Sequence, residues 1–122
     1  MKINFSKKII KKINSKKATI SVIGLGYVGL PLCLALSKAK FKVFGIDNNV
    51  ERVKLLKNRI SYISTIKNSQ IRKLDNKKFI PTNNFEEILN SDVIIICVPT
   101  PIDSRKKPNM KYVENVVKQI DK

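Results

Sequence analysis

The chain has 122 residues with 25 Lys or Arg and 9 Asp or Glu, so its formal net charge is +16. This length allows one domain, and the longest apolar run, at 93–98, is too short to span a membrane. A basic charge would suit nucleic acid, but no nucleic-acid-binding motif accompanies the lysines, so we expect no specific nucleic-acid partner.

The first 17 residues contain seven lysines and no acidic residue. Phe5, Ile9, Ile10 and Ile13 fall on one face of a helix, with lysines around the rest. A basic amphipathic helix can lie on a membrane surface. We expect instead a leader helix over 1–17 that docks on its own domain or frays.

From Thr19 onward, β-branched runs alternate with helical patterns, which is typical of an α/β fold with a parallel sheet. A strand at 19–23 ends in a glycine turn, and a helix follows from about 27 to 39. The strand at 93–98 is continuously apolar, which predicts that both of its faces are covered. The other predicted elements are strands at 42–46 and 79–80 and helices at 50–58, 70–74, 85–89 and 112–120, with Asn49 and Asn83 as caps.

The turn after the first strand carries a Gly-x-Gly-x-x-Gly pattern at a strand-to-helix junction. In such a turn Gly24 allows the sharp bend, Gly26 lets the backbone approach a pyrophosphate, and Gly29 lets helix and strand pack closely. The helix N-terminus also favours anions. We therefore expect a Rossmann-like, doubly wound parallel sheet that is incomplete, with about four strands.

Three polar residues extend the predicted site. Asp47 ends the second strand, where a carboxylate can accept hydrogen bonds from ribose hydroxyls and would repel the extra phosphate of NADP, so NAD is favoured. Arg52, one turn into the next helix, is placed to lie over adenine or reach a phosphate. Thr100 follows the apolar strand at the ligand-binding edge of the sheet and can contact cofactor or substrate.

The chain has no histidine, and its two cysteines lack the spacing of a metal site or the context of a nucleophile. Cys33 and Cys97 are expected to be free thiols in a cytoplasmic protein. The sequence thus offers a cofactor site without catalytic groups and without a metal.

Three segments, 23–32, 43–47 and 91–101, resemble the UDP-glucose/GDP-mannose dehydrogenase family, in its N-terminal NAD-binding domain. The Tyr-Val-Gly-Leu-Pro continuation of the glycine turn and the Val-Pro-Thr-Pro strand exit are more specific than the glycines. The basic loop 102–108 and the leader helix look most like the UDP-N-acetylglucosamine 6-dehydrogenase branch.

This resemblance implies an NAD-dependent enzyme that oxidises the C6 hydroxyl of a nucleotide sugar to a carboxylate, for surface polysaccharide synthesis. It assigns the adenosine side of the cofactor to Asp47 and Arg52, and the nicotinamide side to Val98 and Thr100. It assigns the pyrophosphate to the glycine turn, at Gly24, Gly26, Tyr27, Val28 and Gly29.

The family's catalytic cysteine and lysine and its nucleotide-sugar site lie beyond residue 122, so residues 18–122 are expected to be a partial NAD-binding domain, inactive alone. A separately encoded C-terminal half would complete it. The alternative is a stand-alone NAD-binding or regulatory module without catalysis. At Lys40 and Arg59 the family often has glycine, and a left-handed backbone there would cost on the order of 1 kcal/mol each.

Overall fold

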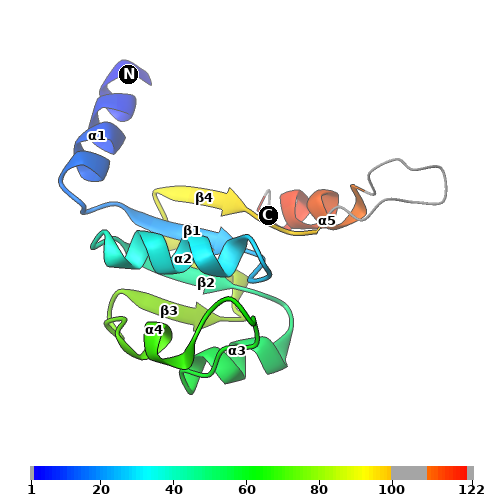
Figure 1. Cartoon of the computed structure of the whole chain (residues 1–122). Coiled ribbons are helices and arrows are strands. Elements are labelled where there is room, and N and C mark those ends of the chain that lie inside the picture. The colour runs from blue at the N-terminus through cyan, green and yellow to red at the C-terminus, as the bar shows by residue number, and fades with distance from the viewer. Residues whose placement is uncertain (1, 100–109, 121–122) are drawn as a thin grey trace.

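The computed structural model describes residues 2–99 and 110–120 as a parallel sheet with flanking helices (Figure 1). The four strands run parallel in the order β3-β2-β1-β4, which confirms the predicted fold class. The elements are α1 (Lys2–Asn14), β1 (Thr19–Ile23), α2 (Gly29–Lys38), β2 (Lys42–Ile46), α3 (Val50–Lys57), α4 (Asn68–Arg72), β3 (Phe79–Thr82), the 3-10 helix η1 (Phe85–Asn90), β4 (Val93–Ile96) and α5 (Lys111–Ile120).

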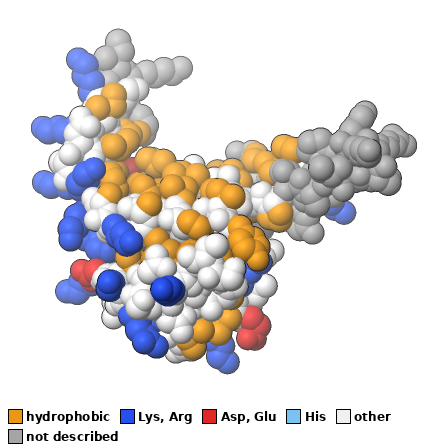
Figure 2. Space-filling model, viewed as in Figure 1, with side chains coloured by type: hydrophobic (Ala, Val, Ile, Leu, Met, Phe, Trp, Pro, Cys, Tyr) orange, Lys and Arg blue, Asp and Glu red, His pale blue; other side chains and the backbone are white. Residues whose placement is uncertain are grey.

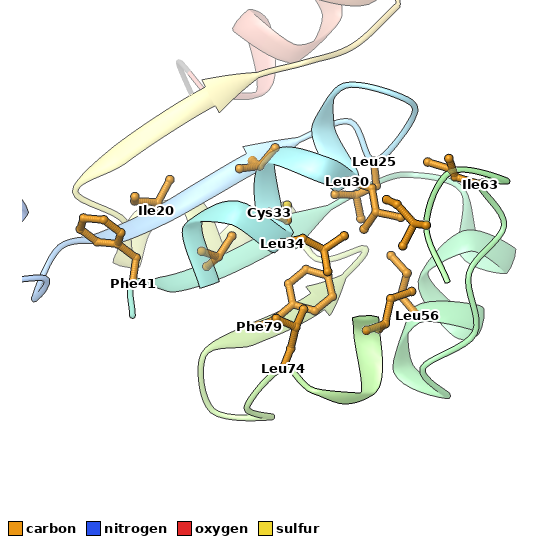
Figure 3. Packing of buried hydrophobic residues seen from close by; sticks show 14 of the residues in the cluster. Ile20, Leu25, Leu30, Cys33, Leu34, Phe41, Leu56, Ile63, Leu74 and Phe79 are labelled. Carbon is orange, nitrogen blue, oxygen red and sulfur yellow. The ribbon is translucent and has the colours of Figure 1, made fainter. Parts of the chain in front are cut away.

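Alternate residues of the inner strands supply two cores on opposite faces of the sheet. Ile20 and Val22 of β1 belong to the larger cluster, which α2, α4 and the segment before α4 cover (Figure 3). Ile23 of β1 packs on the other face with Ile88 of η1 and Val116 of α5. Burial on both faces is what a doubly wound sheet requires.

The outer strand β4 is less covered than its sequence predicts. Among the described strands it pairs only with β1, and all four of its residues are half-buried. Val93 and Ile95 lie at the margin of one core, while Ile94 and Ile96 lie at the margin of the other. Both faces of β4 are therefore covered, as predicted, but only partly within the described part of the chain. Figure 2 shows hydrophobic side chains exposed between α1 and α5, where β4 lies.

Three helices end in the same way. In α1, α2 and α3 the chain leaves the helix through a left-handed residue, Lys16, Lys40 or Arg59, with φ of 63°, 78° and 59°. In each, the N–H of this residue and of the next one donate to carbonyls of the last turn, the Schellman pattern; at the end of α2 the bonds are 3.0 and 3.2 Å long. Lys40 and Arg59 therefore have the left-handed backbone on which the cost of a non-glycine residue at these positions depends.

The N-terminal segment forms a helix, as predicted, but that helix projects from the sheet (Figure 1). Ile10 and Ile13, on the apolar stripe, are 56% and 38% exposed, so of the two expected alternatives, docking or fraying, these residues do not show docking. A polar contact connects the end of α1 to the segment before β4: Lys12 pairs with Asp92 at 3.0 Å. Asp92 also accepts the Thr19 N–H, and these two bonds hold the pKa of its carboxyl below the ordinary value.

Several element boundaries differ from the prediction. The helix expected at 85–89 is a 3-10 helix, and its cap is Asn84 rather than Asn83: the Asn84 side chain accepts the Glu86 N–H at 3.0 Å. Asn49 caps α3 as predicted, accepting the Arg52 N–H. No helix in the described part of the chain is long and apolar enough to cross a bilayer.

Candidate functional site

A cleft of about 600 Å³ opens at the carboxyl ends of β1, β2 and β4. The chain crosses from one side of β1 to the other between β3 and β4, so this edge is the switch point where doubly wound sheets bind ligands. The lining residues come from the glycine turn, the ends of β2 and β4, and the helices α3, η1 and α5: Ile23, Gly24, Leu25, Gly26, Tyr27, Val28, Asp47, Asn48, Arg52, Phe85, Cys97, Val98, Pro99, Asn115 and Val116.

The three glycines of the turn differ in what requires them. Gly24 has φ of +98°, and a Cβ there would lie 2.6 Å from the Cys97 carbonyl oxygen. A Cβ on Gly29 would lie 1.7 Å from the Gly24 carbonyl oxygen. A Cβ on Gly26 would meet nothing closer than the Arg52 Nη1, at 4.0 Å. The fold thus needs the first and third glycines, whereas the space beside the Gly26 backbone is left open by the residues that the structure describes.

The start of α2 also suits an anion. Val28, at the N-cap, provides no side-chain cap, so backbone N–H groups of the first turn are not satisfied by a side chain. Tyr27 and Val28 are 76% and 70% exposed and line the cleft beside them. In this turn the Leu30 N–H donates to the Gly26 carbonyl oxygen at 3.1 Å and Pro31 has no N–H, so among the described residues the Gly29 N–H and the positive end of the helix dipole are available to a phosphate. The residues therefore fit a dinucleotide pyrophosphate at this turn.

Asp47 is buried at the end of β2, as a carboxylate that holds the turn together. Its Oδ2 accepts the Leu25 N–H at 2.9 Å and its Oδ1 accepts the Asn49 N–H at 2.8 Å. The Arg52 Nη1 lies 3.4 Å from Oδ2. A carboxylate has about four acceptor positions, so one remains on Oδ1 for a ribose hydroxyl. The structure brings Asp47 into the cleft, as the ribose role requires, and adds a structural role.

Arg52 reaches back from α3 across the glycine turn. Its guanidinium lies 5.4 Å from the centre of the Tyr62 ring, next to the open space at Gly26. The Tyr62 hydroxyl donates to the Leu25 carbonyl oxygen. Sequence reasoning missed Tyr62, because it stands in an irregular segment with no periodicity or spacing that links it to the turn.

The segment that follows β4 forms another wall of the cleft. Cys97 and Val98 line the cleft, and Thr100 lies outside the described residues. Both cysteines are free, and burial raises the pKa of the Cys33 and Cys97 thiols, so neither is a thiolate at neutral pH. This wall can contact a ligand, but its thiol is not activated for nucleophilic attack.

Residues 18–122 match the UDP-glucose/GDP-mannose dehydrogenase family, NAD binding domain. Protein CapL of Staphylococcus aureus is 43% identical over 91 residues, which are 75% of this chain and 20% of CapL. UDP-N-acetyl-D-glucosamine 6-dehydrogenase of Salmonella typhi is 38% identical over 75% of this chain and 21% of its own length.

Comparison with solved structures gives the same family. A ternary complex of GDP-mannose dehydrogenase from Pseudomonas aeruginosa superposes with a TM-score of 0.76 at 29% identity, over 83% of this chain and 24% of that one. The chain spans about a fifth to a quarter of the length of these relatives. It belongs to the UDP-glucose/GDP-mannose dehydrogenase family, and residues 18–122 are NAD-binding domain of that family.

Proposed function

We propose that this chain supplies the NAD-binding part of a UDP-N-acetylhexosamine 6-dehydrogenase, which oxidises the sugar C6 hydroxyl to a carboxylate for surface polysaccharide synthesis. Bound NAD would accept the hydride in each of the two oxidation steps. The similarity to the UDP-N-acetyl-D-glucosamine 6-dehydrogenases of Salmonella typhi and Pseudomonas aeruginosa supports this substrate class over UDP-glucose.

One observation supports the site most strongly: the backbone of Gly26 is unshielded, and no contact within residues 2–99 and 110–120 requires a glycine there. We assign the pyrophosphate to the turn, at Gly24, Gly26, Tyr27, Val28 and Gly29. We assign the ribose to Asp47, the adenosine side to Arg52, and the nicotinamide side to Val98 and Thr100.

The cofactor choice is tested by titrating the purified chain with NAD and with NADP in a calorimeter. The buried Asp47 carboxylate would face the 2′-phosphate of NADP, and like charges repel. We expect NAD to bind more tightly. Equal or tighter binding of NADP would contradict the ribose role of Asp47.

The described residues bring no activated nucleophile into the cleft, so we propose that the chain alone does not oxidise the sugar. A separately encoded C-terminal half would pair with the open edge of β4 and bring the nucleotide-sugar site. We place the complete enzyme in the cytoplasm, which the free cysteines favour.

Activity tests this proposal directly. The chain with NAD and UDP-N-acetylglucosamine should form no NADH, and co-expression with the following reading frame should restore the reaction. If the chain binds NAD tightly as a monomer and no second polypeptide restores oxidation, the alternative holds: a stand-alone NAD-binding or regulatory module.

A further inference from the structure

The backbone around Leu25 is held from both sides. Its N–H donates to the Asp47 Oδ2 at 2.9 Å, and its carbonyl oxygen accepts the Tyr62 hydroxyl. The side chain of Leu25 is fully buried in the larger core. Both polar groups and the side chain of this residue are therefore fixed at the centre of the turn that precedes α2.

The fixed carbonyl also determines the direction of the next N–H. The described peptide bonds are trans, and in a planar trans peptide the carbonyl and the N–H point in opposite directions. With the Leu25 carbonyl turned to Tyr62, the Gly26 N–H points away from Tyr62. Tyr62 is not part of the cleft wall, whereas Gly26 is. Within the described part of the chain, no hydrogen bond donated by this N–H is present.

Glycine makes this orientation easy to lose. Because Gly26 has no Cβ, it tolerates backbone angles that other residues avoid, so the peptide between Leu25 and Gly26 can rotate at little cost. A rotated peptide would turn its carbonyl oxygen, with its partial negative charge, to the cleft and would repel a phosphate. A hydrogen bond to the Leu25 carbonyl opposes that rotation.

Tyr62 is itself held in place for this bond. The Arg52 guanidinium lies 5.4 Å from the centre of the Tyr62 ring. Arg52 also pairs with Asp47, and Asp47 accepts the Leu25 N–H. The four residues form a closed ring of contacts around the backbone of Leu25, whose N–H and carbonyl belong to the two peptides on either side of it. Burial raises the pKa of the Tyr62 hydroxyl, so it stays protonated at neutral pH and can donate.

We propose that Tyr62 is a positioning residue for the cofactor: by holding the Leu25 carbonyl, it directs the Gly26 N–H into the cleft, where it donates to a phosphate of NAD. The role of the Gly26 N–H as a donor to NAD rests on the proposed function. The orientation of the Leu25–Gly26 peptide in the free chain does not depend on the proposed function. Tyr62 itself touches no cofactor.

Tyr62→Phe removes the hydroxyl and keeps the ring against Arg52. We expect NAD to bind the variant about five- to tenfold more weakly, which is the worth of one hydrogen bond. Ile71→Val is the matched control, because it trims a fully buried residue of α4 in the same core and lowers stability without touching the turn. It should leave the NAD affinity unchanged, as calorimetry would measure.

Residual dipolar couplings of the Gly26 N–H in the free chain report the peptide orientation directly. We expect them to change in Tyr62→Phe and to stay constant in Ile71→Val. Unchanged couplings in Tyr62→Phe overturn the proposal, and so does an equal loss of NAD affinity in both variants. If the wild-type chain binds no NAD, the proposed function fails, while the couplings still decide whether Tyr62 sets the peptide.

Discussion

The three glycines of the turn give the sharpest test of the site, because the structure predicts opposite results for the same substitution. Alanine at Gly29 would place its Cβ 1.7 Å from the Gly24 carbonyl oxygen, which is backbone and cannot swing away. Alanine at Gly24 would be strained by φ of +98° and would press on the Cys97 carbonyl oxygen at 2.6 Å. Alanine at Gly26 would meet only the end of the Arg52 side chain, at 4.0 Å.

These distances set the magnitudes. Gly29→Ala should lower the free energy of unfolding by at least about 3 kcal/mol, the upper range for overpacking. Gly24→Ala should cost about 1–2 kcal/mol for the left-handed backbone alone. Gly26→Ala should leave stability unchanged or raise it by up to about 1 kcal/mol, because alanine restricts the unfolded chain. The Gly26 methyl would instead occupy the space of the pyrophosphate.

Losing one charge-assisted hydrogen bond to a phosphate costs about 2–3 kcal/mol, so NAD should bind Gly26→Ala roughly 30- to 150-fold more weakly. Urea denaturation measures the stability of all three variants, and calorimetry measures NAD binding to Gly26→Ala. The assignment of the pyrophosphate to Gly26 fails if Gly26→Ala unfolds as easily as Gly29→Ala, or if it binds NAD as tightly as the wild type.

Three further predictions concern residues around the site and the helix ends. Asp47→Asn should lower the free energy of unfolding by about 1–3 kcal/mol, because one oxygen that accepts a backbone N–H becomes an amide that donates; an unchanged urea midpoint would contradict this. Lys40→Gly should stabilise the chain by about 1 kcal/mol, because glycine adopts a φ of 78° without strain. Arg59→Gly should stabilise the chain less, because it also removes a guanidinium that lies over an aromatic ring. A larger gain in stability for Arg59→Gly than for Lys40→Gly in urea denaturation would contradict this. The pKa of Asp92 is lower in the folded chain than its ordinary value. The bonds of Asp92 therefore stabilise the fold fully at pH values above the ordinary pKa, and this stabilisation is lost as the pH falls through the lower pKa of the folded chain. Hydrogen-exchange protection in the last turn of α1 should therefore fall at acid pH, and Asp92→Asn should remove that pH dependence.

The sequence predicted the sheet well, because local patterns determine it. The strands at 19–23 and 42–46 match β1 and β2 at both ends, since β-branched runs bounded by turn residues specify where each strand begins and ends. The family resemblance also pointed to Lys40 and Arg59, since the family often has glycine there, and both residues have a left-handed backbone in the structure.

Features that depend on distant parts of the chain were not accessible in the same way. The apolar run of β4 looks like a strand with two covered faces, yet coverage depends on which strands and helices lie beside it. The stripe of α1 looks like a docking face, yet Ile10 and Ile13 on it are exposed. Tyr62 lies 37 positions from Leu25, and no sequence pattern connects a loop tyrosine to a carbonyl so far away.

The double role of Asp47 changes which experiment tests the cofactor site. From the sequence, a carboxylate at the end of the second strand has one task, the ribose, and its removal should simply weaken NAD. In the structure the same carboxylate also holds the Leu25 N–H, so its removal would loosen the turn that binds the pyrophosphate. A weaker affinity in an Asp47 variant would therefore have two causes. A weaker affinity in Gly26→Ala would have one cause, because no contact among the described residues depends on the hydrogen that the methyl replaces.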